Sequence, residues 1–137
     1  MGTREKPTFD ERVEEYVDSP MITHRLRYDK CVSAQIRGNF GVYRTTVEVD
    51  KKKVIGECSC PSELWPCKHV HALRATWDRN PNSFFNLDEW LATLPKQSKA
   101  TLVDAIRDMV LLSPNLLSVF EIPGFEDEED NEEDYYE

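Results

Sequence analysis

The sequence predicts an α+β fold in which a short antiparallel β-meander leads into a cysteine-rich finger of ββα type. A small helical bundle and a disordered acidic tail follow. Three observations predict this order: strand-favouring residues alternate over residues 22–49, three of the four cysteines lie in residues 58–67, and apolar residues recur at helical spacing after residue 87. The expected parts are residues 1–20 with a short helix, residues 21–79 with the meander and the finger, residues 80–125 as a helical extension, and residues 126–137 as the tail.

A short helix and three strands are expected before the cysteine-rich stretch. Asp10 is suited to cap a helix over residues 11–17, and Pro20 ends that segment because the residue before a proline avoids the helical conformation. Alternating apolar and polar residues predict strands over residues 22–27, 31–38 and 42–49. Because only short turns join these strands, we expect them to pair antiparallel.

The stretch from Cys58 to His69 has the composition of a metal site. It contains a Cys-x-Cys pair, a gap of six residues and a Cys-x-His pair. Thiolate and imidazole groups are the ligands that tetrahedral zinc prefers, and four protein ligands leave no position for an activated water. The spacing therefore predicts one structural Zn²⁺ per chain, with the ligands Cys58, Cys60, Cys67 and His69. The alternatives are a chance cluster in a loop and a redox-active Cys-x-Cys pair.

A helix is expected directly after the second ligand pair, because Val70, Leu73 and Trp77 have helical spacing. Two residues that are two positions apart inside a helix point about 200° apart and cannot share one metal. Cys67 is therefore expected at or before the first helical turn. His71 is a rival ligand, since it would lie four positions from Cys67 on the same helical face.

These features resemble a SWIM zinc finger. The order of Cys-x-Cys, a short gap, Cys-x-His and a helix of small residues is typical of that family, and the resemblance covers about residues 30–77. Two segments upstream are similar to the strands that precede such a finger, namely Ile36–Gly38 and Tyr43–Val49. The resemblance implies zinc on Cys58, Cys60, Cys67 and His69. It also implies binding to DNA or to proteins, with no reaction of its own. His71 stands where the family usually carries an apolar residue.

The net charge of −9 is concentrated at the C-terminal end of the sequence. Residues 126–137 contain nine of the 26 acidic residues and no basic one, which leaves 17 acids and 17 bases in the rest of the chain. Within that neutral part, residues 22–53 are basic, as expected for a face that contacts phosphates. The candidate nucleic-acid contacts are Arg37, Arg44, Lys51, Lys52, Lys53 and Lys68. The alternative is a solvated strand face without a ligand.

Helical spacing of apolar residues predicts three further helices, over residues 87–94, 98–112 and 115–120. We expect Trp90 and the leucines of these helices to pack on the sheet and the finger helix. Alternatively, they form a groove or a dimer face.

The acidic tail contains neither Gly nor Pro, and its self-repulsion predicts disorder. Tyr135 and Tyr136 indicate a regulatory or partner-docking tail. It would bind a basic groove of a partner, or compete with nucleic acid for the basic strands.

Composition and motifs also exclude some classes of protein. No apolar run approaches the ~20 residues that span a bilayer, and no signal segment is evident. Clustered cysteines indicate an intracellular location, in the cytoplasm, nucleoid or nucleus, where thiols stay reduced. The isolated Cys31 is expected to be a small buried residue. No Gly-rich phosphate loop or Gly-x-Ser-x-Gly motif is present and His24 has no evident partner, so we do not expect an enzyme.

Two functions agree with these features. The first is a non-catalytic, zinc-binding interaction module in nucleic-acid transactions, which binds DNA, RNA or a protein of a DNA- or RNA-processing complex. The second is a pure protein–protein adaptor, in which the zinc finger only stabilises the fold while the C-terminal helices and the acidic tail bind the partner. The neutral charge of residues 1–125 favours the adaptor, because a dedicated nucleic-acid-binding protein is usually basic. Neither function implies an oligomeric state.

Overall fold

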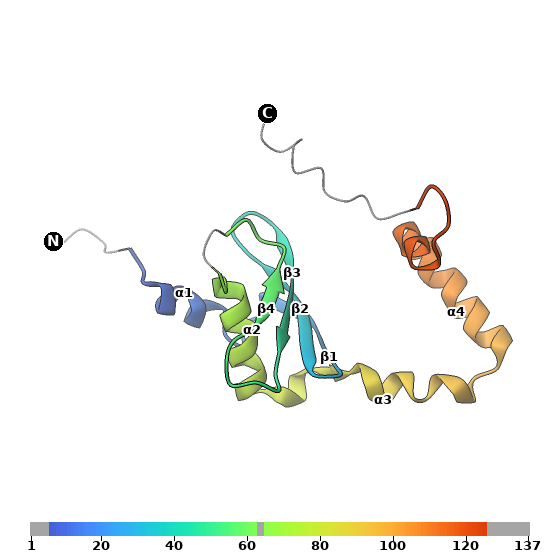
Figure 1. Ribbon diagram of the computed structural model, residues 1–137, viewed down its shortest axis with the longest axis horizontal. Helices are drawn as coiled ribbons and strands as arrows, with labels where there is room; N and C mark the ends of the chain where they lie inside the picture. The colour runs from blue at the N-terminus through green and yellow to red at the C-terminus, as the bar shows by residue number, and fades with distance from the viewer. Residues whose placement is uncertain (1–5, 63–64, 126–137) are drawn as a thin grey trace. The chain divides into compact units, whose positions relative to one another are not determined.

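The computed structural model describes residues 6–62 and 65–125 (Figure 1). It divides into two compact units, with the boundary between Ala92 and Thr93. The first unit contains the strands β1 (Ile22–Tyr28), β2 (Cys31–Arg37), β3 (Val42–Glu48), β4 (Gly56–Cys58) and β5 (Phe85–Asn86), the helices α1 (Phe9–Tyr16), α2 (Lys68–Arg79) and α3 (Leu87–Leu91), and the 3₁₀ turn η1 (Pro81–Ser83). The second unit contains η2 (Leu94–Lys96), α4 (Lys99–Leu112) and η3 (Pro114–Phe120).

The five strands form one sheet in the order β4-β3-β2-β1-β5. Within the run β4-β3-β2-β1 each pair of adjacent strands is antiparallel, which confirms the predicted α+β fold with an antiparallel meander. The two-residue strand β5 was not predicted, and it pairs parallel with β1, Leu26 opposite Phe85. The sheet is therefore mixed, and residues that the sequence assigns to the helical extension complete its edge.

The core lies between the sheet and α2, which packs across β2, β3 and β4. The predicted alternation in β2 is confirmed, because Val32, Ala34 and Ile36 are all buried on the helix side. Val70 and Leu73 of α2 are fully buried against them. The opposite face of the sheet, called the open face, carries the intervening residues of the strands, among them Gln35 and Arg44.

A β-bulge explains the weak alternation of the first strand. The register with β2 shifts between Thr23 and Leu26, so that two residues oppose Ala34 alone. His24 within the bulge has a φ of +54°, in the left-handed region. Because one extra residue reverses the side to which the following side chains point, Leu26 lies on the open face together with Ser33.

The N-terminal helix α1 packs against α2. Its N-cap is Thr8, whose hydroxyl accepts a hydrogen bond from the N–H of Glu11 at 3.2 Å. The prediction of Asp10 as the cap is therefore wrong. Asp10 instead lies in the first turn, where a carboxylate is favourable next to the free N–H groups. An exposed ion pair at 2.7 Å joins Glu14 of α1 to Arg79 of α2.

None of the described residues from α3 onward is buried. Trp90 lies in α3, which contacts β1, but its side chain is 45% exposed and its ring lies 6.4 Å from that of Phe85. The prediction that Trp90 packs on the sheet and the finger helix is therefore wrong, because its side chain is half-exposed beside the edge strand β5.

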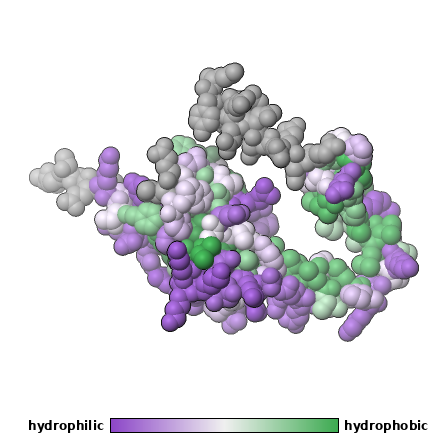
Figure 2. All heavy atoms as spheres, viewed as in Figure 1, coloured by the Kyte–Doolittle hydropathy of each residue, from purple (hydrophilic) through white to green (hydrophobic). Residues whose placement is uncertain are grey.

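In the second unit Ser98 caps α4, as predicted, by accepting from the N–H of Thr101 at 3.1 Å. η3 packs on α4, and it is a 3₁₀ segment where an α-helix was expected. Figure 2 shows hydrophobic side chains on the surface of this unit. The predicted acidic tail, residues 126–137, lies outside the described residues. None of the described helices has the length and apolarity needed to cross a membrane.

Candidate metal centre

The sheet and the finger helix bring the two ligand pairs together. Cys58 is the last residue of β4, and its pairing with Thr45 of β3 fixes the position of Cys58 at the edge of the sheet. Cys60 follows in the next loop. Cys67 is the N-cap of α2 with extended backbone angles, as predicted, and His69 lies in the first turn. Because Cys67 is outside the regular helix, its side chain and that of His69 reach the same point.

The four predicted ligand atoms form a compact cluster. The three Sγ atoms and one imidazole nitrogen lie within 4.8 Å of one another. Nδ1 of His69 is 3.7 Å from Sγ of Cys58 and 4.0 Å from Sγ of Cys67. Tetrahedral zinc, with bonds of about 2.3 Å to sulfur and 2.0–2.1 Å to nitrogen, requires sulfur–nitrogen separations of about 3.6 Å. The residues present therefore fit zinc.

The rival ligand His71 does not belong to this cluster. Its ring packs edge-on against Phe9 of α1, with 5.5 Å between the ring centroids. Cys31, at the start of β2, is also outside the cluster and is half-buried. Cys60, Cys67 and His69 are buried and Cys58 is half-buried, so the shell of four ligands is closed and shielded.

Hydrogen bonds within the cluster set the protonation of its thiols. A hydrogen bond from the Cys67 thiol lowers the pKa of Cys58 to about 3, and hydrogen bonds with His69 and Thr45 act in the same direction. The same bond to Cys58, together with burial, raises the pKa of Cys67, and burial raises the pKa of Cys60. All three thiols release their protons when they bind a metal, and the low pKa of Cys58 makes it the first of them to do so.

Several residues around the ligands were not found from the sequence. The buried hydroxyl of Thr45 lies 3.2 Å from Sγ of Cys58, where it donates to the thiolate. The rings of Tyr16 and Tyr43 lie 5.1 and 5.2 Å from that of His69. Gly38 leaves room for the rings of Tyr43 and His69, since a Cβ there would lie 2.6 Å from Cε2 of Tyr43 and 3.2 Å from Nε2 of His69. Of these contacts, the sequence could have indicated only that between Thr45 and Cys58, and only if the register of β3 against β4 had been known.

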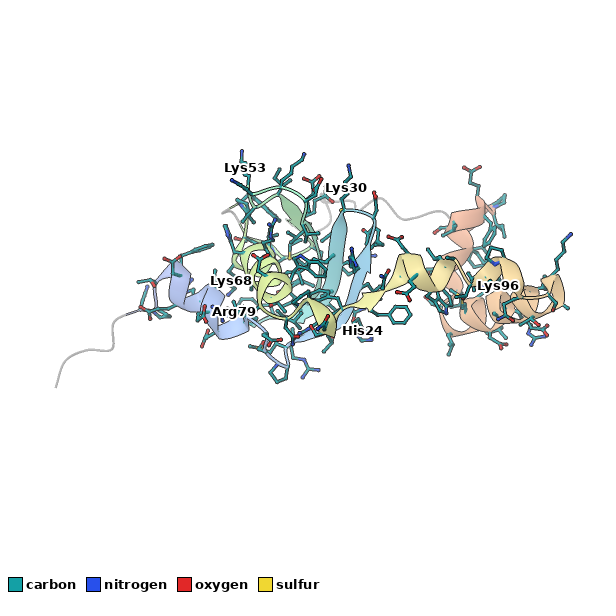
Figure 3. All side chains as sticks on the ribbon, turned by 90° about the horizontal axis from the view of Figure 1, so that it is seen from below. His24, Lys30, Lys53, Lys68, Arg79 and Lys96 are labelled. Carbon is teal, nitrogen blue, oxygen red and sulfur yellow. The ribbon has the colours of Figure 1, made fainter. Side chains whose placement is uncertain are left out.

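The predicted nucleic-acid contacts do not form one patch. Arg37 and Arg44 belong to the open face of the sheet, where they line two adjacent hollows. Lys68 lies on the other side, at the start of α2 and beside the metal ligands. The third group consists of Lys51, Lys52 and Lys53, which lie in the turn before β4. Lys53 projects at the same end of the sheet as Lys30 (Figure 3).

The geometry of the site is that of a zinc finger with one closed Cys₃His shell. Residues 43–73 match the model of the SWIM zinc finger family. The chain thus contains a SWIM zinc finger, and it holds one Cys₃His zinc site of the kind typical of that finger, formed by Cys58, Cys60, Cys67 and His69. No curated protein and no solved structure matches the chain.

Proposed function

We propose that this protein is a non-catalytic SWIM finger module that binds nucleic acid, and that the open face of its sheet contacts the phosphates. It acts alone or with a protein of a DNA- or RNA-processing complex, inside the cell, where thiols stay reduced. The zinc has a structural role, because four protein ligands leave no coordination position for a substrate.

The observation that carries the proposal is the arrangement of the two faces of the sheet. One face is filled by α2 and the zinc site, whereas the other has two adjacent hollows of about 270 and 440 Å³. Arg37 and Arg44 line them together with His24 and Gln35, and both arginines are exposed. Glu57 lies on the same face, opposite Thr46. The guanidinium groups that line these hollows are suited to phosphate oxygens.

The test is the dependence of binding on salt. Phosphate binding weakens as salt rises, with a slope of about 0.9 per contact in duplex DNA and about 0.7 in single strands. The triple variant Arg37→Ala, Arg44→Ala, Lys52→Ala is expected to bind labelled DNA or RNA more weakly and with a shallower slope. The control variant Lys96→Ala, Lys99→Ala removes charge from the second unit only. Equal affinity and slope for the triple variant and the wild type would contradict the proposal.

A protein–protein adaptor is the second candidate function, and the second unit favours it. Large apolar side chains of α4 are exposed, among them Leu111 at 73% and Leu112 at 87%. Exposed helical apolar surface is typical of sites that dock a partner. An adaptor would show no salt-dependent affinity for nucleic acid. Its partner binding would be lost with Leu112→Asp and retained with the triple variant.

A further inference from the structure

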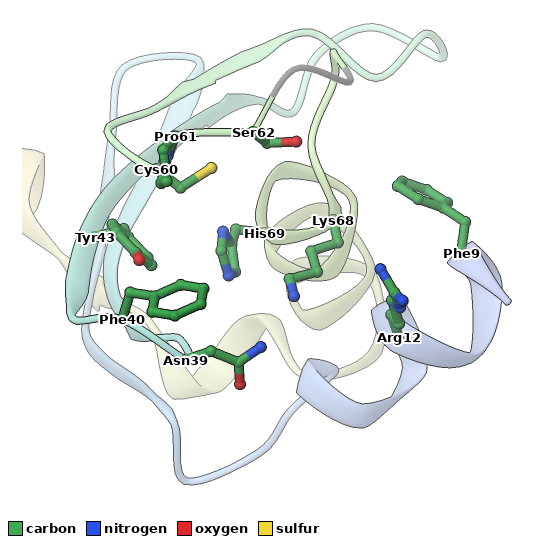
Figure 4. A pocket seen from close by; sticks show the side chains of 10 residues that line it. All are labelled: Phe9, Arg12, Asn39, Phe40, Tyr43, Cys60, Pro61, Ser62, Lys68 and His69. Carbon is green, nitrogen blue, oxygen red and sulfur yellow. The ribbon is translucent and has the colours of Figure 1, made fainter. Parts of the chain in front are cut away.

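A small hollow lies beside the zinc ligands on the helix side of the sheet (Figure 4). Its volume is about 190 Å³ and its lining is mainly apolar. Phe40 and Tyr43 lie on one side of it, Lys68 and Arg12 on the other, and Asn39 lies between the two sides (Figure 4). These residues come from α1, the β2–β3 turn, β3 and α2, all within the first unit. The hollow thus combines aromatic rings with two cationic groups.

Phe40 has no evident role in folding. Its side chain is 88% exposed at the tip of the β2–β3 turn, which is closed by a hydrogen bond of 2.8 Å from the N–H of Gly38 to the carbonyl of Gly41. A ring in this position leaves its apolar face in contact with water. Covering this face with another flat ring would release that water and add the specific attraction of stacked rings.

The cations of the hollow are available to an anion. Within the described part of the chain, neither Arg12 nor Lys68 forms an ion pair, and the ammonium of Lys68 lies 5.4 Å from the ring of Tyr16. Zinc with three thiolates carries a net charge of about −1, which the two cations exceed by about one charge. The described residues that line the hollow include no acid, so Arg12 and Lys68 are suited to a single anionic group.

The size of the hollow indicates one group of a longer chain. A pocket for a whole small molecule usually measures about 300–1,000 Å³, whereas this one has 190 Å³. A nucleobase next to its phosphate supplies the planar ring and the anion together. Asn39, which offers both donors and an acceptor, can bind the polar edge of such a base. In a duplex the base faces are stacked on one another, so only a single strand offers a free face.

We propose that this hollow binds one unstacked base of single-stranded DNA or RNA. Phe40 stacks on the base, while Arg12 and Lys68 contact the flanking phosphate. This inference rests on the proposed binding of nucleic acid, and it adds the form of nucleic acid that the protein prefers and a second contact surface, separate from Arg37 and Arg44.

The experiment compares Phe40→Ala with wild-type full-length protein, loaded with zinc, for binding to a labelled oligothymidine and to a duplex of equal length. Stacking of one base contributes about 1–3 kcal/mol, so the Kd for the single strand should rise about 5- to 150-fold. The Kd for the duplex should stay unchanged. Phe40→Trp keeps a flat ring at this position and should retain single-strand affinity. Phe120→Ala is the matched control, because Phe120 is an exposed phenylalanine of the second unit. Lys68→Ala should weaken single-strand binding and reduce its salt slope.

The outcomes separate this inference from the proposed function. The inference is overturned, and the proposed function stands, if nucleic-acid binding is lost in the triple variant Arg37→Ala, Arg44→Ala, Lys52→Ala but is unchanged in Phe40→Ala. Absence of binding to either nucleic acid overturns both. A peptide copying residues 126–137 that binds in a Phe40-dependent way, in place of the oligothymidine, would assign the hollow to an acidic aromatic peptide and also overturn the inference.

Discussion

The hydroxyl of Thr76 joins two segments that are 58 residues apart, because it accepts a hydrogen bond from the backbone N–H of Asp18 at 2.9 Å. It also donates to the carbonyl of Ala72 at 2.7 Å, one turn earlier in α2. Asp18 has a φ of +50° and ends the N-terminal segment just before β1. The side chain of Thr76 is fully buried, whereas Asp18 is exposed, so the bond itself is part-buried. The finger helix thereby fixes the path of the N-terminal segment.

Thr76→Val is expected to destabilise the protein at neutral pH. Valine has nearly the same shape but no hydroxyl, so the N–H of Asp18 loses its protein partner, and a typical intramolecular hydrogen bond contributes about 0.5–1.5 kcal/mol net. For a unit of this size, each kcal/mol lowers the Tm by about 4–8 °C. Thermal unfolding followed by circular dichroism, at a fixed excess of zinc, measures this change. Thr76→Ser keeps the hydroxyl and should lose less, and equal Tm values for Thr76→Val and wild type would contradict the role of the bond.

The part of the fold that follows from local sequence patterns was predictable. The two-residue period of β2 identified Val32, Ala34 and Ile36, and the spacing of the ligand pairs identified the zinc site, because both patterns are read within a few residues. The bulge at His24 and the pairing of β5 with β1 depend on non-local hydrogen bonds, and short windows carry no sign of them.

The surroundings of the site were less predictable than its ligands. The hollow beside the zinc site draws Arg12, Asn39 and Lys68 from three separate segments, so no spacing rule connects them. For the same reason the basic residues, which form one group in the sequence, belong to three places in the structure. Charge along a chain predicts a patch only where the strands that carry it share a face.

Removal of zinc is expected to unfold the finger. Structural zinc in finger peptides contributes about 10–16 kcal/mol of apparent binding energy, comparable with the whole stability of a small domain, about 5–15 kcal/mol. A chelator, or the substitution Cys67→Ser, should therefore remove the metal and most of the ordered structure. Native mass spectrometry and circular dichroism follow the two losses. Cys31→Ser is the matched control, because Cys31 is outside the cluster. A protein that stays folded without metal would show that zinc does not stabilise it.

The two neighbouring histidines are expected to respond differently to substitution. His69→Ala removes a ligand and should lower zinc affinity strongly, measured by competition with a chromophoric chelator. His71→Ala should leave zinc affinity unchanged and cost only the edge-on contact with Phe9. Loss of zinc in His71→Ala, with retention in His69→Ala, would exchange the two assignments.

Gly56 is expected to tolerate no side chain, although its backbone has an ordinary φ. It lies in β4 opposite Val47, where α2 approaches the sheet closely. A Cβ at this position would lie 2.9 Å from Cγ1 of Val70 and even closer to the carbonyl oxygen of Thr46. Because a backbone oxygen of a central strand cannot move aside as a side-chain end can, Gly56→Ala must displace β4 or α2. Overpacking of this kind costs about 1–3 kcal/mol.

This displacement should also reach the metal, because β4 carries Cys58 and α2 carries His69. Gly56→Ala is therefore expected to lower both the Tm and the zinc affinity, while the neighbouring substitution Glu57→Ala, on the open face, should change neither. Chelator competition and thermal unfolding of the two variants measure these effects. A Gly56→Ala protein with wild-type Tm and zinc affinity would show that the close approach of α2 to β4 is not needed to hold the site. If instead the Tm falls while zinc affinity stays, the packing of Val70 on β4 stabilises the fold without positioning the ligands.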